Sequence, residues 1–141
     1  MASFEHELAD VPGEPRAREL WLQHAAGFIL FEDVRRYAME RTDPALTDEA
    51  RAAVQKGIDD AVYGLMMVID GVSGQLSNAT HSVYIDFIVR FATRRAKINV
   101  ESQVDLRQGD GMCMGYHGWL ESDFGNNPVV RPAEPKSTSA K

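Results

Sequence analysis

The side chains best suited to chemistry or binding are concentrated in one segment, residues 106–125. It contains five glycines, a cysteine, a histidine, three aromatic residues and several carboxylates. Glycine permits positive φ and close backbone approach, and aromatic rings provide a large contact area with few rotamers to restrict. The segment therefore predicts a binding surface loop, whose expected contact residues are Tyr116, His117, Trp119, Asp123 and Phe124. Alternatively, the glycines serve tight turns and the aromatic side chains cover one end of the hydrophobic core.

A catalytic or metal-binding role is the second interpretation of this segment. A thiol beside an imidazole is a common nucleophile pair, and carboxylates with histidine and cysteine can hold a metal ion. The candidate residues are His117 with Asp110, Cys113 or Asp123, and His81 from outside the segment. Gly115 and Gly118 disfavour the helix that would bring Cys113 and His117 onto adjacent turns. Because HExxH, paired CxxC and calcium-loop patterns are absent from the sequence, we expect a non-enzymatic protein without a cofactor and keep a small enzyme as the alternative.

The amino-acid composition restricts the expected cellular compartment and the expected kinds of binding partner. A chain of 141 residues with 44% hydrophobic and 26% charged residues can bury its own core. The net charge of −6 opposes binding to nucleic acid and to anionic membranes, so neither is expected. Cys113 is the single cysteine, and the N-terminal stretch lacks a basic and apolar secretory pattern. These features predict a cytoplasmic protein.

Two helices are expected to position the glycine-rich and aromatic segment. Apolar residues recur at helical spacing through residues 47–74, and Thr47 is placed to cap the N-terminus of that helix. An earlier helical pattern covers residues 15–41 and is broken by Pro44. The short connection predicts an antiparallel pair. His24 lies on the apolar stripe of the first helix, where a core histidine is expected rather than a metal ligand.

An alternating pattern follows the helices. Residues 83–92 and 98–106 alternate apolar and polar side chains, which predicts two strands of an antiparallel hairpin. Both apolar faces lie on the same side when odd residues of the first strand oppose even residues of the second. One such register places Arg90 opposite Glu101. Residues 75–80 are polar and are expected to form a turn.

The order of these elements predicts the fold class. Helices followed by strands indicate an α+β protein, with two N-terminal antiparallel helices packed on one face of a small antiparallel sheet. A two-stranded sheet is marginal, so a third strand is expected from residues 4–11 or 112–120. The predicted division is an irregular leader at 1–14, a single α+β domain at 15–125 and a flexible tail at 126–141.

Residues 61–74 (AVYGLMMVIDGVSG), the alternating segment and residues 109–125 (GDGMCMGYHGWLESDFG) together resemble small bacterial proteins of similar length that have no assigned activity. This resemblance implies no catalytic residues. Small acidic α+β proteins often act as immunity or adaptor proteins that block a partner, which is an analogy of size, charge and class. We therefore expect a protein-binding module. Tyr84 and Ile88 on the polar strand face indicate partial cover there, which a homodimer through the sheet would provide.

Overall fold

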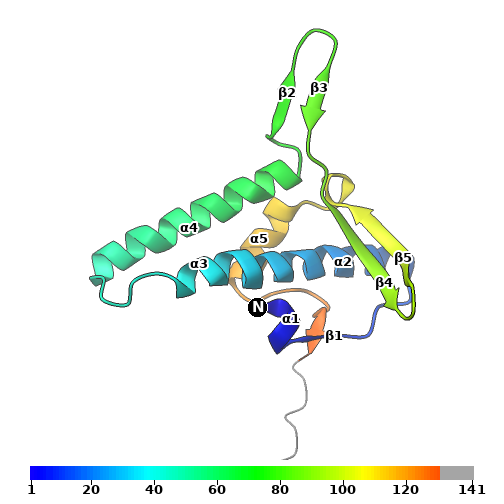
Figure 1. The fold of residues 1–141 in the computed structure, drawn as a ribbon, viewed down its shortest axis with the longest axis horizontal. Helices are drawn as coiled ribbons and strands as arrows, with labels where there is room; N and C mark the ends of the chain where they lie inside the picture. Colours follow the sequence, from blue (N-terminus) through cyan, green and yellow to red (C-terminus); the bar gives the residue numbers. More distant parts are fainter. Residues whose placement is uncertain (131–141) are drawn as a thin grey trace, which may run out of the picture.

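The structure is a computed structural model that describes residues 1–130, except for the side chains of Ser3 and Phe4. It confirms the α+β class, since helices are combined with three separate two-stranded antiparallel sheets (Figure 1). The helices are α1 (Ala2–Glu5), α2 (Pro15–Leu30), the π-helical η1 (Phe31–Arg36), α3 (Tyr37–Glu40), α4 (Asp48–Ile69), the 3-10 helix η2 (Leu106–Gln108) and α5 (Met112–Leu120). The strands are β1 (Glu7–Leu8), β2 (Gln75–Ser77), β3 (Ser82–Tyr84), β4 (Ile88–Arg94), β5 (Ile98–Asp105) and β6 (Val129–Val130).

The two long helical segments begin where local sequence signals place them. The Glu14 carboxylate accepts hydrogen bonds from the backbone N–H groups of Arg16 and Ala17, at 3.0 and 2.6 Å. Thr47 caps α4 by accepting from Ala50 N at 3.2 Å. Side-chain acceptors at these positions satisfy backbone donors that lack an intrahelical partner. No helix of the described residues combines the length and apolar character that a membrane crossing requires.

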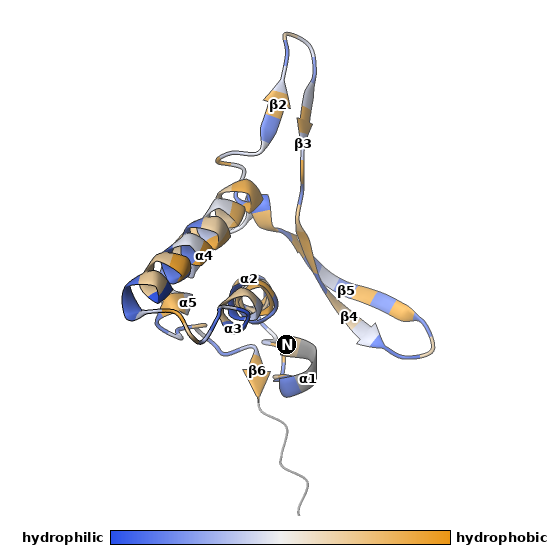
Figure 2. Ribbon diagram, turned by 60° about the vertical axis from the view of Figure 1, so that its left-hand side comes forward, coloured by the Kyte–Doolittle hydropathy of each residue, from blue (hydrophilic) through white to orange (hydrophobic). Residues whose placement is uncertain are grey.

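The helices enclose most of the core, against which Val89 of β4 also packs, and α2 lies between α5 and the longer hairpin. In Figure 2, α4 and α5 lie on one side of α2, and the β4–β5 hairpin lies on the other. The close contacts of β4 and β5 with helices are made to α2, whereas α4 packs mainly on α5 and η1. Trp21, Leu22 and Phe28 of α2 are buried. The main cluster of buried core residues comprises Ala26, Phe31, Val62, Met66, Ile69, Leu106, Met112, Tyr116 and Trp119. The sheet therefore rests on one helix, and the second long helix serves the core around α5.

The β4–β5 hairpin has the expected direction but a different register. Val89 lies opposite Val104, so odd residues of the first strand oppose even residues of the second as far as Phe91, whereas further along Thr93 lies opposite Asn99. Arg90 pairs with Gln103, not with Glu101, and the predicted Arg90 register was wrong. A bulge between Phe91 and Ala92 shifts the pairing further along, which local alternation cannot encode.

The predicted strand at residues 83–92 is two strands with different partners. β3 pairs with β2, so residues 75–77 form a strand where a polar turn was expected. The chain leaves the strand conformation before β4, and Leu106 N donates to Phe87 O at 2.9 Å. Phe87 is half-buried against the core. We call residues 71–86 the arm, because β2 and β3 project from the body in both views (Figures 1 and 2).

The expected third strand does not join the hairpin. Residues 112–120 are helical, and the leader contributes β1, which pairs with β6 instead, Leu8 lying opposite Val129. Ala9 N donates to Pro128 O at 2.8 Å, and Pro128 is buried. The packed chain thus continues through Val130, beyond the predicted start of the tail at 126. Residues 131–141 of that predicted tail lie outside the described residues.

Candidate functional site

The glycine-rich and aromatic segment contains a helix, not the surface loop that the sequence predicted. Gly111, at the N-cap of α5, has φ of 106° and no side chain to cap the helix. Asp70, just after α4, supplies the cap: its carboxylate accepts from Met112 N at 2.6 Å and from Cys113 N at 2.9 Å. A carboxylate at a helix N-terminus satisfies free N–H groups and meets the positive end of the helix dipole. This long-range cap explains how a helix forms despite two internal glycines.

Trp119 is a core residue that holds α5 against α2. Its side chain is 3% exposed, and its indole lies between Gly27 of α2 and Gly115 of α5. A Cβ at Gly27 would overlap the indole, and one at Gly115 would lie 2.5 Å from Cζ2 of Trp119. The indole Nε1 donates to Nδ1 of His24 at 3.0 Å, which supports the core position predicted for His24. The two glycines therefore create the slot that the indole fills.

Tyr116 is also buried, at 4% exposure. Its hydroxyl donates to the backbone oxygen and to Oδ1 of Asp59, both at 3.2 Å, and Arg35 Nε donates to the same Oδ1 at 2.6 Å. Burial, followed by the nearby Asp59 carboxylate, raises the pKa of Tyr116. These contacts join α5, α4 and η1. Tyr116 thus has the surroundings of a core residue with a satisfied hydroxyl.

The five expected contact residues are not exposed alike. His117 and Asp123 are exposed, Phe124 is half-buried, and Tyr116 and Trp119 are buried. The Phe124 ring stacks on the Trp119 indole, with centroids 6.1 Å apart and planes inclined by 7°. Asp123 accepts from Gly125 N at 2.9 Å in the turn after α5. Of the five, only His117 and Asp123 present mainly exposed side chains to a partner.

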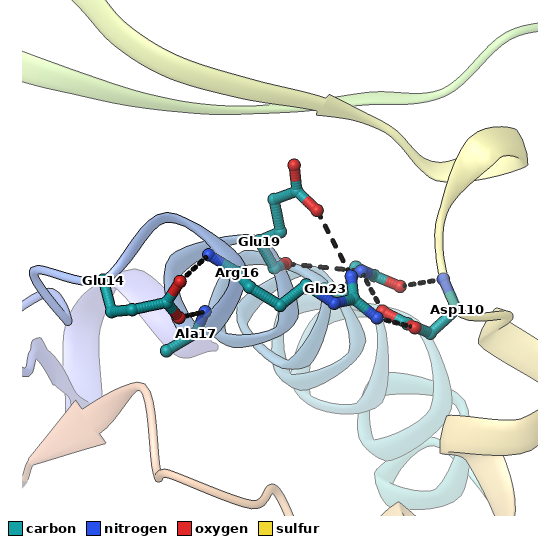
Figure 3. Close-up of polar contacts among 6 residues, drawn as sticks. All are labelled: Glu14, Arg16, Ala17, Glu19, Gln23 and Asp110. Atoms are coloured by element: carbon teal, nitrogen blue, oxygen red, sulfur yellow. Dashed lines mark hydrogen bonds and ion pairs between the residues drawn. The ribbon is translucent and has the colours of Figure 1, made fainter.

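The alternative catalytic residues are engaged in separate contacts. Cys113 is half-buried, and burial, together with the Asp70 carboxylate, raises the pKa of its thiol, which disfavours the nucleophilic thiolate. Asp110 pairs with Arg16, and its Oδ2 accepts from Gln23 Nε2 at 2.8 Å (Figure 3). Arg16, followed by Gln23, lowers the pKa of Asp110. A lowered pKa keeps this carboxyl ionised and unsuited to act as an acid near neutral pH.

The contact of Gln23 with Asp110 has a structural role. Gln23 is buried and its Oε1 accepts from Asp110 N at 2.7 Å while its Nε2 donates to the carboxylate of the same residue (Figure 3). Both hydrogen-bonding groups of a buried amide are thereby satisfied. The pair joins α2 to the loop before α5, so Asp110 positions α5 through this contact.

One group of potential metal ligands occurs among the described side chains, and it lies elsewhere. Glu5, His6 and Glu32 each offer a ligand atom, and these atoms lie within 4.8 Å of one another. Arg36 Nη1, however, donates to Glu5 at 3.1 Å and to Glu32 at 2.9 Å. The arginine already neutralises both carboxylates, so a cation would have to displace it.

A cleft of about 500 Å³ lies between η1 and the segment after α5. It is lined by aromatic side chains, including Phe28, Trp119 and Phe124, and by Arg35 and Arg36. Arg35 is paired with Asp59, and Arg36 with three glutamates. Because both guanidinium groups already have anionic partners, the cleft offers no free cation to an anionic ligand.

The arm carries the clearest exposed apolar surface. Leu76 and Val83 lie directly opposite each other across β2 and β3, so they share one face. Their exposed fractions are 76% and 68%. The other face is polar, because Gln75 Nε2 donates to the hydroxyls of Ser77 and Ser82 at 3.1 and 3.2 Å. The arm is thus an amphipathic hairpin whose apolar face is open to solvent.

The two ends of the arm are held by specific contacts. At the tip, Asn78 Oδ1 accepts from the backbone N–H groups of Thr80 and His81 at 2.9 and 2.8 Å, which closes the turn. At the base, the Arg107 guanidinium lies 4.4 Å from the centroid of the Tyr84 ring. Gly74, with φ of 83°, turns the chain out of α4 into β2. The arm therefore has a fixed base and an ordered tip.

The sequence interpretation missed the arm although a signal was present. Residues 75–84 contain no Asp, Glu, Lys or Arg, which is unusual beside a charged fraction of 26% for the chain. Leu76 and Val83 flank a turn that begins with Asn78, a residue that favours turns through its own side chain. With Leu76 as its one apolar residue, the segment 75–77 carries too weak a pattern to separate a short strand from a turn.

Comparison with known proteins supplies no relative from which a role can be transferred. No protein-family model matches this sequence, and no curated protein or solved structure matches it. The fold and surface define an α+β protein with a projecting, amphipathic arm, and its function has to be inferred from this geometry.

Proposed function

We propose that this protein is a non-enzymatic protein-binding module, of the immunity or adaptor kind, that engages its partner through the arm. The observation that supports the proposal is the exposed apolar face formed by Leu76 and Val83 on a hairpin that projects from the body (Figure 1). Exposed apolar patches of this kind commonly mark interaction sites. A partner that covers this face would remove apolar surface from water.

The rest of the fold supports the arm in this proposal. α2 acts as the rigid support behind the β4–β5 sheet, and Arg107 and Gly74 fix the base of the arm. A contact surface that is ordered before binding loses less conformational entropy on association. The polar ladder of Gln75, Ser77 and Ser82 contributes to that order.

The proposal retains part of the aromatic segment. His117 and Asp123 are exposed and are available as additional contact residues. Tyr116, Trp119 and Phe124 would act indirectly, because their packing keeps α5 in place. A cytoplasmic setting and a protein partner, without nucleic acid or membrane, are also part of the proposal, and they are supported by the single cysteine and the net charge of −6.

A small enzyme or metal-binding protein that uses His117 with Asp110, Cys113 or Asp123 is the second candidate. This candidate has less structural support than the binding module, because Asp110 is engaged by Arg16 and Gln23, and the Cys113 thiol has a raised pKa. Separate surroundings for these groups favour structural roles over a shared reaction centre.

Affinity capture of the tagged full chain from its native cells tests the proposal. The wild type is compared with a Leu76→Ser/Val83→Thr variant and with Ile98→Ser, which alters a residue of similar exposure on the other hairpin. The wild type and Ile98→Ser should recover the same protein, and the arm variant should lose it. Equal recovery by the arm variant would show that the arm is not the contact surface. Loss on His117→Ala/Asp123→Asn alone would assign binding to the aromatic segment.

A further inference from the structure

The arm has the properties expected of a self-associating element. We infer that its partner is a second copy of this chain, and that two arms pack their apolar faces together in a symmetric dimer. The inference rests on the function proposed for the arm and specifies the partner. In a twofold interface the same patch is used by both subunits, so Leu76 and Val83 of each copy would meet Leu76 and Val83 of the other.

The apolar face of the arm is not covered by another part of the described chain. Within residues 1–130, no further strand pairs with β2 or β3. A two-stranded hairpin is marginally stable in water unless an apolar face is packed against another element. Here that face, formed by Leu76 and Val83, stays exposed, while the polar face is internally hydrogen-bonded. A second arm would supply the missing layer.

The accessible area is large for a monomer of this size. A compact monomer of 15.7 kDa has about 7,300 Å² of accessible surface, whereas this chain has 10188 Å². Residues 131–141 can contribute at most about 1,700 Å², the area of a fully extended segment of their mass. Residues 1–130 therefore expose about 1,600 Å² more than a compact chain of the same mass. Each partner in a standard interface buries roughly 800 Å², and the excess, summed over all of residues 1–130, is larger than this area.

The arm is an uncharged segment of an acidic chain, which permits contact with an identical copy. Two copies with a net charge of −6 repel one another, and like charges placed opposite across an interface destabilise it. Residues 75–84 carry no Asp, Glu, Lys or Arg, so two arms can meet without such a contact.

Sedimentation velocity of the full chain, from low micromolar to near-millimolar concentration, tests the inference. The wild type and Ile98→Ser should sediment with twice the 15.7 kDa chain mass, and Leu76→Ser/Val83→Thr should sediment with once that mass. A monomeric wild type over the whole range would overturn the inference. A dimer that persists in the arm variant, or that is lost in Ile98→Ser alone, would also overturn it.

A charge-exchange experiment decides the matter even if the double variant fails to fold. Leu76→Lys and Leu76→Asp should each be monomeric, because like charges would then face each other across the twofold axis. An equimolar mixture should form a dimer that contains one copy of each variant. Failure of the mixture to dimerise would overturn the inference. A monomeric wild type that still captures another protein through its arm would refute the dimer and leave the proposed function intact. A monomeric wild type that captures no protein would refute both the dimer and the proposed function.

Discussion

The indole Nε1 of Trp119 donates a hydrogen bond to Nδ1 of His24, 3.0 Å away, and thereby joins α5 to α2. An indole nitrogen is a donor only, so Nδ1 of His24 is the acceptor and its proton resides on Nε2. Burial lowers the pKa of His24, and the charges of Asp123 and Asp110 oppose this effect in part. The contact therefore exists with a neutral imidazole and is lost when Nδ1 is protonated.

The first prediction is that stability falls as the pH falls below the ordinary histidine pKa of about 6.5. The folded pKa of His24 is lower than its unfolded value, so the unfolded state binds more protons in this range. The free energy of unfolding, measured with urea at a series of pH values, should decrease from neutral toward acidic pH. His24→Gln keeps an acceptor for the indole but does not titrate, so its decrease should be smaller. Equal pH profiles for the two proteins would contradict the assignment.

The second prediction concerns the slot for Trp119. Gly27→Ala places a methyl group where the indole lies, and overpacking of this kind should lower the free energy of unfolding by about 1–3 kcal/mol. Gly57 is the matched control, because it is an exposed helical glycine with nothing within 4 Å of an added Cβ. Gly57→Ala should raise stability by about 0.5–1 kcal/mol. Denaturation curves that shift in the same direction for both variants would refute the slot.

The third prediction concerns the cap of α5. Asp70→Ala removes the acceptor of two backbone N–H groups, those of Met112 and Cys113, and should cost about 0.5–2 kcal/mol. Asp60→Ala is the control. It removes an exposed carboxylate of α4, the helix that precedes Asp70, where Asp60 contacts Lys56. Amide hydrogen exchange should accelerate in α5 for the Asp70 variant only. Unchanged protection of α5 would show that the helix does not depend on Asp70.

The fourth prediction separates the core and binding roles of the aromatic segment. Trp119→Ala should lower the free energy of unfolding by about 3–5 kcal/mol, because it leaves a cavity between α2 and α5. His117→Ala alters an exposed residue of the same helix and should change stability by less than about 0.5 kcal/mol. Near-ultraviolet circular dichroism and urea denaturation provide the measurement. A stable, native-like Trp119→Ala protein would restore the binding role that the sequence suggested for this residue.

The expectations that held were those encoded by neighbouring residues. The predicted N-termini of the two long helices, at Pro15 and just after Thr47, were correct, because a cap involves residues within one turn of each other. The parity of the β4–β5 pairing was correct as far as Phe91, since it follows from the alternation of side chains, and it is lost beyond the bulge, where Thr93 lies opposite Asn99. The register was wrong, because a bulge after Phe91 depends on how the hairpin packs on α2.

Local sequence by itself therefore determined the α+β class, the long helices and the later hairpin. Tertiary structure decided the rest: Asp70 caps a helix distant in the chain, and Gly27 makes room for an indole on that helix. Alternation in residues 83–92 is the same for one strand or two, and the arm is distinguished from the hairpin by the pairing of β3 with β2 and of β4 with β5. Contacts between residues far apart in sequence leave no periodic signal. For this reason the sequence left a binding role and a core role open for Trp119, and only the three-dimensional structure decided between them and showed the arm.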